Sequence, residues 1–218
     1  MRRDIVTAVI AMLVFTVLLG LVYPFTITGI SQVAFPGNAN GQKVYVNGRL
    51  VGSKIIGQNF ATVEYKEGKP VEEEKELVTK ADPRYFQSRP SATKPANNAA
   101  ASTFSNLGPN NKATEEAIAE RIKAYLAMEK PYVPGLTAAT VPVDAATASA
   151  SGLDPEISEA NAGIQAHRVA AVRHLPLATV DSLIAKYTSG RGLGFSGEPG
   201  VNVLELNLAL DRLAGGER

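Results

Sequence analysis

The stretch "IVTAVIAMLVFTVLLGLV", residues 5–22, decides the architecture of this chain of 218 residues. It contains no charged residue, and the sequence stays uncharged as far as Gly41. A helix of about 20 apolar residues crosses a hydrocarbon layer about 30 Å thick. A core helix of a soluble protein would keep a polar face toward water, and this stretch has none. The sequence therefore predicts a transmembrane anchor over residues 1–28.

The charges around this anchor predict its orientation. Arg2 and Arg3 precede the apolar stretch, and the next basic residue is Lys43. Basic residues stay preferentially on the cytoplasmic side. A cleaved signal peptide is the alternative, but its apolar region spans only about 7–15 residues and ends in a small-x-small site; only a poor site occurs here, near Ala34. We expect an uncleaved single-pass anchor in a bacterial inner (cell) membrane, with residues 29–218 forming an exterior domain.

Composition narrows the classes of function for this domain. Basic and acidic side chains number 22 and 21, which gives a net charge of +1, so no basic surface for nucleic acid is indicated. There is no cysteine, which excludes disulfides, thiolate metal sites and cysteine nucleophiles.

Strand and helix patterns alternate along the exterior domain, which predicts an α/β (α+β) fold. Asn47-Gly48 suits the tight turn of a hairpin over residues 43–53, and a short strand is expected at 141–143. Cap residues and helical spacing of apolar side chains favour helices over the following segments: 110–130 with Asn110 or Asn111 as N-cap, 158–174, 179–187, and the last apolar stretch to Leu213 with Asn202 as N-cap.

Two segments lack such periodicity. Residues 64–82 are rich in charge and are expected to form a solvated loop or short exposed helices. Residues 87–112 are rich in Ser, Asn, Ala and Pro, and we expect a long irregular segment held by buried Phe104 and Leu107.

The stretch around residues 149–175 contains both histidines of the chain and resembles a catalytic segment. Asp154 before Pro155 and then Ser158 are candidate N-caps. His167 falls on the face predicted to pack inward, where histidine is more often a packed residue than a catalyst. His174 lies two helical turns away, which does not fit a chelating pair. The predicted inward face consists of Ala160, Ile164, His167, Ala171 and Leu175.

Other apparent motifs lack the flanking structure or residues that their function requires. The glycines of residues 192–197 match G-x-G-x-x-G, but a predicted helix precedes them and Pro199 follows, so no dinucleotide site is expected. Ser149, Ser151 and Ser158 lack a nucleophile elbow. We therefore predict no catalytic residue, no metal ligand and no intrinsic cofactor.

Several blocks of sequence occur in this order: "GQNF" (57–60), "RPSA" (89–92), "SNLGPNN" (105–111), "VPVD" (141–144), "TASASGLDPEIS" (147–158), "RVA" (168–170) and "VNVLELNLALD" (201–211). Taken together, they resemble the KdpC family, the small subunit of the bacterial Kdp potassium-transporting ATPase. Two departures occur: the charged stretch 64–82 is longer than expected, and "STF" at 102–104 replaces a glycine pair.

The resemblance implies a non-catalytic accessory subunit of an ATP-driven, high-affinity potassium uptake pump. Its partners would be a channel-like potassium-binding subunit, a P-type ATPase catalytic subunit, a very small single-span subunit and the lipid bilayer. The exterior domain would lie over the potassium entrance and stabilise assembly. The chain itself lacks the Asp-Lys-Thr-Gly phosphorylation motif and a Walker A loop.

The resemblance also implies a catalytic chaperone that raises the ATP affinity of the catalytic subunit through a glutamine. The matching residue is Gln165, in "NAGIQ". This segment supplies no glycine loop for phosphate, which favours an amide that packs or hydrogen-bonds within the domain. A membrane-anchored exported hydrolase and a stand-alone periplasmic binding module remain alternative functions.

Overall fold

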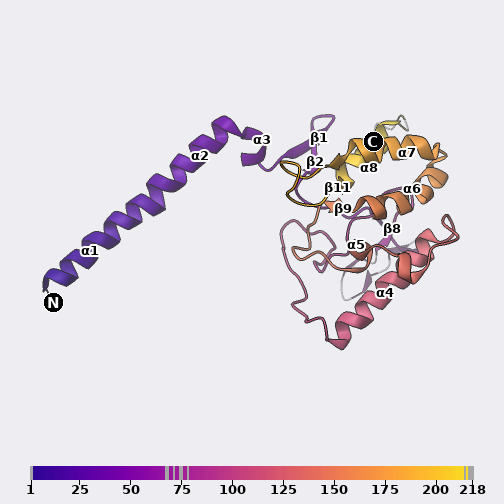
Figure 1. The fold of residues 1–218 in the computed structure, drawn as a ribbon, viewed down its shortest axis with the longest axis horizontal. Helices are drawn as coiled ribbons and strands as arrows, with labels where there is room; N and C mark the ends of the chain where they lie inside the picture. The colour runs from indigo at the N-terminus through magenta and orange to yellow at the C-terminus, as the bar shows by residue number, and fades with distance from the viewer. Residues whose placement is uncertain are drawn as a thin grey trace. The chain divides into compact units, whose positions relative to one another are not determined.

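The structure, a computed structural model, describes residues 2–213 except 67–68, 71, 74–75 and 78, and also residue 215 (Figure 1). The chain divides into two compact units, Met1–Ser53 and Lys54–Arg218.

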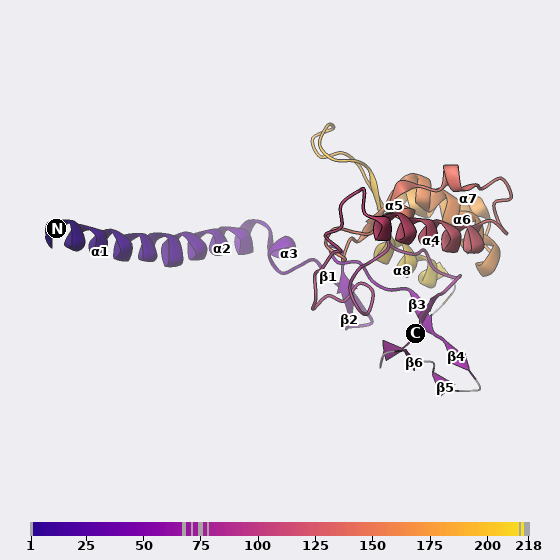
Figure 2. The same ribbon diagram turned by 90° about the horizontal axis from the view of Figure 1, so that it is seen from below.

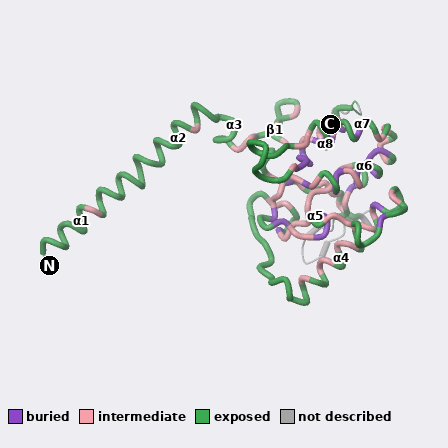
Figure 3. Tube along the Cα trace, viewed as in Figure 1, coloured by how far each residue is buried: buried purple, intermediate pink, exposed green. Residues whose placement is uncertain are grey.

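The first unit begins with one continuous helix built from α1 (Arg2–Val17), the π-helical turn η1 (Leu18–Val22) and α2 (Tyr23–Ala34). It is long and apolar enough to cross a membrane, as predicted. Most of its side chains are exposed (Figure 3). Pro24 does not end the helix. A proline ring clashes with the carbonyl four residues earlier, here that of Gly20, and the π turn that contains Gly20 accommodates this local change.

A short helix α3 (Pro36–Ala39) leads to a hairpin of β1 (Lys43–Val46) and β2 (Arg49–Ser53). At the turn, Asn47 and Gly48 have φ angles of 49° and 76°. Positive φ at both positions is the requirement of a type I′ turn. The predicted hairpin is therefore confirmed.

The central sheet of the second unit has the antiparallel order β10 (Thr188–Ser189), β11 (Gly200–Asn202), β9 (Glu156–Ile157). All three residues of β11 are buried. A Cβ on Gly200 would lie 2.6 Å from the Glu156 carboxylate, so a larger residue here would require the Glu156 side chain to move.

The prediction of a solvated loop or short exposed helices over residues 64–82 is wrong where the structure describes this segment, because its residues pair as short antiparallel strands. β3 (Ala61–Val63) pairs with β8 (Thr79–Ala81), and two smaller antiparallel pairs lie between them. The predicted solvation of the acidic side chains in this segment lies largely outside the described residues. The smaller pairs are β4 (Tyr65–Lys66) with β5 (Lys69–Pro70), and β6 (Glu72–Glu73) with β7 (Glu76–Leu77).

The second unit also contains helices, which together with its strands confirm the mixed α/β class. Four predicted helices are confirmed, while the predicted strand at 141–143 is wrong, because Pro142 precedes a helical turn there. Helix α6 contacts α4, α7 and β11, and Figure 2 shows α4, α6 and α7 gathered on one side of this unit. The helices are α4 (Lys112–Glu129), η2 (Ala138–Thr140), α5 (Val143–Ala146), α6 (Glu159–Arg173), α7 (Leu177–Lys186) and α8 (Val203–Leu213).

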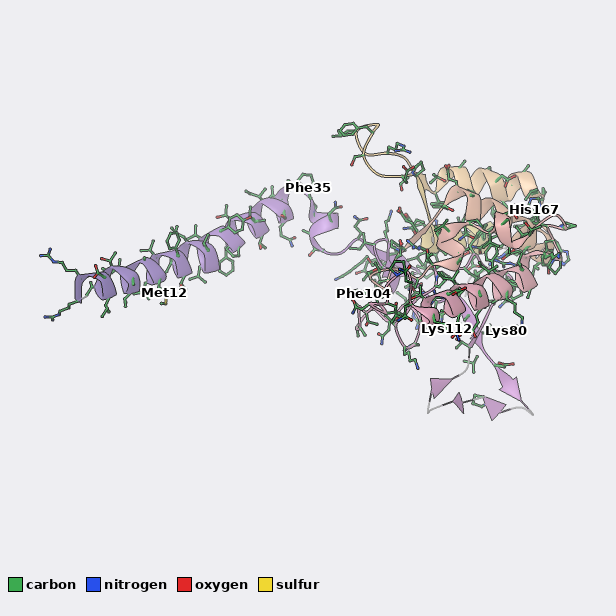
Figure 4. All side chains as sticks on the ribbon, turned by 60° about the horizontal axis from the view of Figure 1, so that its bottom comes forward. Met12, Phe35, Lys80, Phe104, Lys112 and His167 are labelled. Carbon is green, nitrogen blue, oxygen red and sulfur yellow. The ribbon has the colours of Figure 1, made fainter. Side chains whose placement is uncertain are left out.

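The predicted inward face of α6 is wrong. Ala160, His167 and Ala171 are exposed, and His167 lies at the outer surface of the unit (Figure 4). The helix instead buries a face of small and polar residues. The spacing of apolar residues does not indicate that this face points inward. This face consists of Asn161, Ala162, Gln165, Ala166, Arg168, Val169 and Ala170.

The irregular segment that follows residue 87 is fastened by polar contacts. Phe104 and Leu107 are 53% and 44% exposed, so their prediction as buried anchors is wrong. The Ser91 hydroxyl instead donates to the carbonyl of Gly152 over 2.7 Å, and the Thr103 amide donates to the carbonyl of Ser151 over 3.2 Å.

Candidate functional site

Gln165 lies in the interior of the second unit, and its side chain is 2% exposed. Its Oε1 accepts from the Gln87 amide (2.7 Å) and from Arg168 (3.0 Å). Its Nε2 donates to the Gln87 carbonyl (3.2 Å) and to Asn161 Oδ1 (2.9 Å). A glutamine amide offers two donors and two acceptor positions. All four are therefore occupied by this chain's own groups.

Asn207 on α8 makes the same contact with the preceding residue. Its Oδ1 accepts from the Phe86 amide (2.9 Å), and its Nδ2 donates to the Phe86 carbonyl (3.0 Å). Asn207 and Phe86 are both fully buried. Two side-chain amides from different helices thus bind the backbone of two consecutive residues, where strand partners would otherwise be needed.

A buried ion pair lies beside these amides. Arg168 Nε donates to Glu129 Oε1 over 2.9 Å, and the two side chains are 0% and 1% exposed. The same guanidinium donates to the carbonyls of Pro83 and Tyr85. Arg168 therefore joins α6, the end of α4 and the segment that precedes Phe86.

The N-terminus of α6 closes the network. Ser158 is its N-cap, as predicted, and accepts from the Asn161 amide over 3.1 Å. Asp144 accepts from the Ser158 amide and hydroxyl, each over 2.8 Å, and from the Asn161 side chain over 2.9 Å. A carboxylate at this position also interacts favourably with the helix dipole. Tyr125 on α4 completes the network by donating to Asn161 Oδ1.

Burial dominates the electrostatics of this network. It raises the pKa of the Glu129 carboxyl, and the Arg168 guanidinium opposes that rise. Burial also raises the pKa of the Tyr125 hydroxyl, and the carboxylates of Glu129 and Asp144 add to this effect. Glu129 Oε2 is buried and has no hydrogen-bond partner among the described residues. The network is therefore polar throughout but largely closed to solvent.

Asp154 has a different role from the predicted helix cap. It accepts from Arg89 over 2.9 Å and from the Glu156 amide over 3.2 Å, and β9 follows it. The extended strand pairing of β9 delays the helix to Ser158. Asp154 therefore connects the "RPSA" segment to the entry of the central sheet.

The remaining candidate residues are not brought together. His167 and His174 are both exposed, and His174 ends α6 with a left-handed φ of 55°. Among the described residues, no group of three or more His, Asp or Glu side chains could hold a metal ion. The glycines of residues 192–197 form an exposed loop between β10 and β11, and no helix opens there as a dinucleotide fingerprint requires.

Comparison with known proteins identifies this framework. Residues 5–212 match the family model "KdpC: K+-transporting ATPase, c chain". The chain belongs to the KdpC family. The "Potassium-transporting ATPase KdpC subunit" of Mycobacterium tuberculosis (strain H37Rv) is 45% identical over 213 residues, which cover 98% of this chain and 100% of the relative.

Two further relatives with the same name support this assignment. The protein of Methylococcus capsulatus is 47% identical over 207 residues, which cover 94% of this chain and 96% of the relative. That of Variovorax paradoxus is 45% identical over 215 residues, which cover 98% of both chains. The similarity to KdpC therefore includes both the apolar helix and the second unit.

The family resemblance pointed to Gln165, but the sequence did not indicate the residues that hold it in place. Glu129 and Asn207 fall in predicted helices and Arg168 in the "RVA" block, and no partner is predicted for any of them. One signal is available for Asn207, which lies between Leu206 and Leu208 on a helix rich in leucine and shares a face with buried residues. A polar side chain on a buried face requires partners.

Proposed function

We propose that this chain is a non-catalytic accessory subunit of an ATP-driven potassium uptake pump, in which it stabilises the complex of channel-like and P-type ATPase subunits. The observation that carries the proposal is the similarity to KdpC subunits over 94–98% of the chain. A very small single-span subunit completes the proposed partners.

The apolar helix serves as an uncleaved single-pass anchor in the bacterial inner membrane. Arg2 and Arg3 hold its N-terminus in the cytoplasm, which leaves the second unit exterior. Helices associate in lipid through close contact of small and β-branched residues. Thr7, Ala11 and Gly20 provide such positions, and the space beside a Cβ on Gly20 is open. We place the contact with the channel-like subunit along this helix.

The second unit supplies another contact, over the potassium entrance of the channel-like subunit. Most polar side chains in its core hold the fold together. We therefore assign this unit a binding role and not a catalytic one. The four hydrogen bonds of Gln165 give this residue a structural role in our proposal. ATP then reaches the complex through the catalytic subunit, and the effect of this chain on ATP affinity is indirect.

Co-expression with the other pump subunits tests this function. The full chain should co-purify with two large membrane proteins and restore potassium-dependent ATP hydrolysis to a complex that lacks it. Deleting residues 1–28 should weaken binding and prevent that restoration. A shortened chain that hydrolyses ATP or another substrate by itself would refute the accessory role and favour the exported hydrolase. Full potassium-dependent activity without the chain would also refute it.

A further inference from the structure

The loop between β10 and β11 exposes two large apolar side chains that have no role in the described core. Leu193 is 91% exposed and Phe195 is 75% exposed. The loop, drawn in yellow, projects from the body of the second unit in Figure 2. We call Leu193 and Phe195 the apolar knob.

Internal hydrogen bonds fix the shape of this loop. Gly192 and Ser196 exchange backbone bonds of 2.7 and 2.8 Å, and the Phe195 amide donates to the Gly192 carbonyl over 3.2 Å. Leu193 has a φ of 53°, a left-handed conformation that costs energy for a residue with a Cβ. The loop is thus held in a conformation that presents the knob outward, although the isolated chain gains no burial from it.

The base of the loop is also ordered. Arg191 forms an ion pair with Glu198, and the chain then enters β11, whose three residues are buried. The knob therefore stands on a support that is continuous with the central sheet. Such support limits the entropy lost when the loop binds a partner.

The charge of the loop indicates whether its partner is a lipid surface or a protein. Residues 192–197 carry no charge, and the one cation of the loop, Arg191, is paired with Glu198. Binding to an anionic lipid surface draws on basic side chains directed at the headgroups. A neutral apolar tip is instead complementary to a neutral, desolvated pocket, the site at which interface hot spots occur. The observations therefore favour a protein partner.

We propose that the apolar knob inserts into an uncharged apolar pocket on the exterior face of a partner subunit of the pump. This inference rests on the proposed function, because it requires the assembled complex. It adds a defined contact: one loop of the second unit, with two side chains, that binds independently of the membrane helix.

Photocrosslinking in the co-expressed complex tests the contact directly. We would replace Phe195 with a benzophenone amino acid in the full chain, with Val143 as the control position because it is 75% exposed in the same unit. Position 195 should give one adduct with a pump subunit, which Val143 should not give. An adduct with lipid alone or with a second copy of this chain, or no adduct, would overturn the proposal.

A double variant, Leu193→Ser with Phe195→Ser, tests the contribution of the knob to binding. We expect at least a tenfold loss of the chain from the purified complex, with Val143→Ser unchanged and with the melting temperature of the variant chain preserved, since the knob packs on nothing in the core. If the unaltered chain co-purifies and the double variant does so equally well, the knob proposal fails alone. If the unaltered chain does not co-purify, the proposed function fails and the knob proposal with it.

Discussion

Replacing Gln165 with alanine would remove four hydrogen bonds at once and leave both backbone groups of Gln87 without a partner. A buried backbone group left unsatisfied costs about 1–3 kcal/mol. Gln87 is only partly buried, so water can replace some of the loss. Arg168 keeps its bonds to Glu129 and to two carbonyls. We therefore expect the free energy of unfolding to fall by about 2–4 kcal/mol.

Asn207→Ala is the matched control for this substitution. It removes an equivalent pair of bonds from Phe86, whose side chain is 0% exposed, so water is less able to compensate. We expect it to cost at least as much as Gln165→Ala. Urea unfolding of the full chain in detergent, followed by circular dichroism, measures both. A loss below about 1 kcal/mol for Gln165→Ala would refute the reasoning, because one ordinary hydrogen bond would account for it.

The apparent ATP affinity of the assembled pump separates a structural role of Gln165 from a nucleotide contact. The measurement belongs well below the melting temperature of either variant. If both amides only hold the segment at residues 86–87, Gln165→Ala and Asn207→Ala should affect ATP affinity alike. A several-fold loss confined to Gln165→Ala would contradict the structural role and give this amide the contact that the family resemblance implies.

Three further predictions concern packing, pH and topology. Gly57→Ala would place a Cβ against the Asp154 carbonyl oxygen, closer than van der Waals contact, and this overpacking should cost about 1–3 kcal/mol; an unchanged melting temperature would contradict it. Hydrogen bonds from Arg84 hold the pKa of the Asp82 carboxyl below its ordinary 3.8, so its contribution to stability is present above pH 3.8 and lost as the pH falls through the lowered value. Unfolding midpoints between about pH 2 and 5 should therefore depend less on pH in Asp82→Asn, and equal slopes in the two proteins would count against this. Finally, the intact mass of the membrane-extracted chain should include residues 2–3, and external protease should digest the second unit; a mature chain that lacks these residues would refute the uncleaved anchor.

The features that sequence predicted correctly depend on neighbouring residues. The Asn47-Gly48 turn and the N-caps Asn111, Ser158 and Asn202 are each defined within three residues along the chain. The apolar helix needs only its own composition. Local chemistry is therefore sufficient for the position and type of these elements.

The errors arise where distant contacts decide. The inward face of α6 depends on distant backbone partners of Gln165 and Arg168. These partners lie 78 to 85 positions earlier in the chain, at Gln87, Tyr85 and Pro83. An apolar pattern cannot indicate that a polar side chain is satisfied by such a segment. The prediction of Asp154 as a helix N-cap is wrong for the same reason, because its partner Arg89 is 65 positions away.

The buried ion pair of Arg168 and Glu129 shows why this interior contains charged residues. Charge pairing alone is a weak reason to bury Arg168 and Glu129, because well-packed apolar residues can replace such a pair without loss of stability. The guanidinium, however, also donates to the carbonyls of Pro83 and Tyr85, which lie in no strand. The Tyr85 carbonyl also accepts from the Gln87 side chain, but an apolar residue at position 168 would leave the Pro83 carbonyl without a partner among the described residues. Arg168 is therefore required mainly for the irregular backbone before Phe86. Asn207 and Gln165 have the same role for Phe86 and Gln87. Glu129 is required to balance the charge that this arrangement buries.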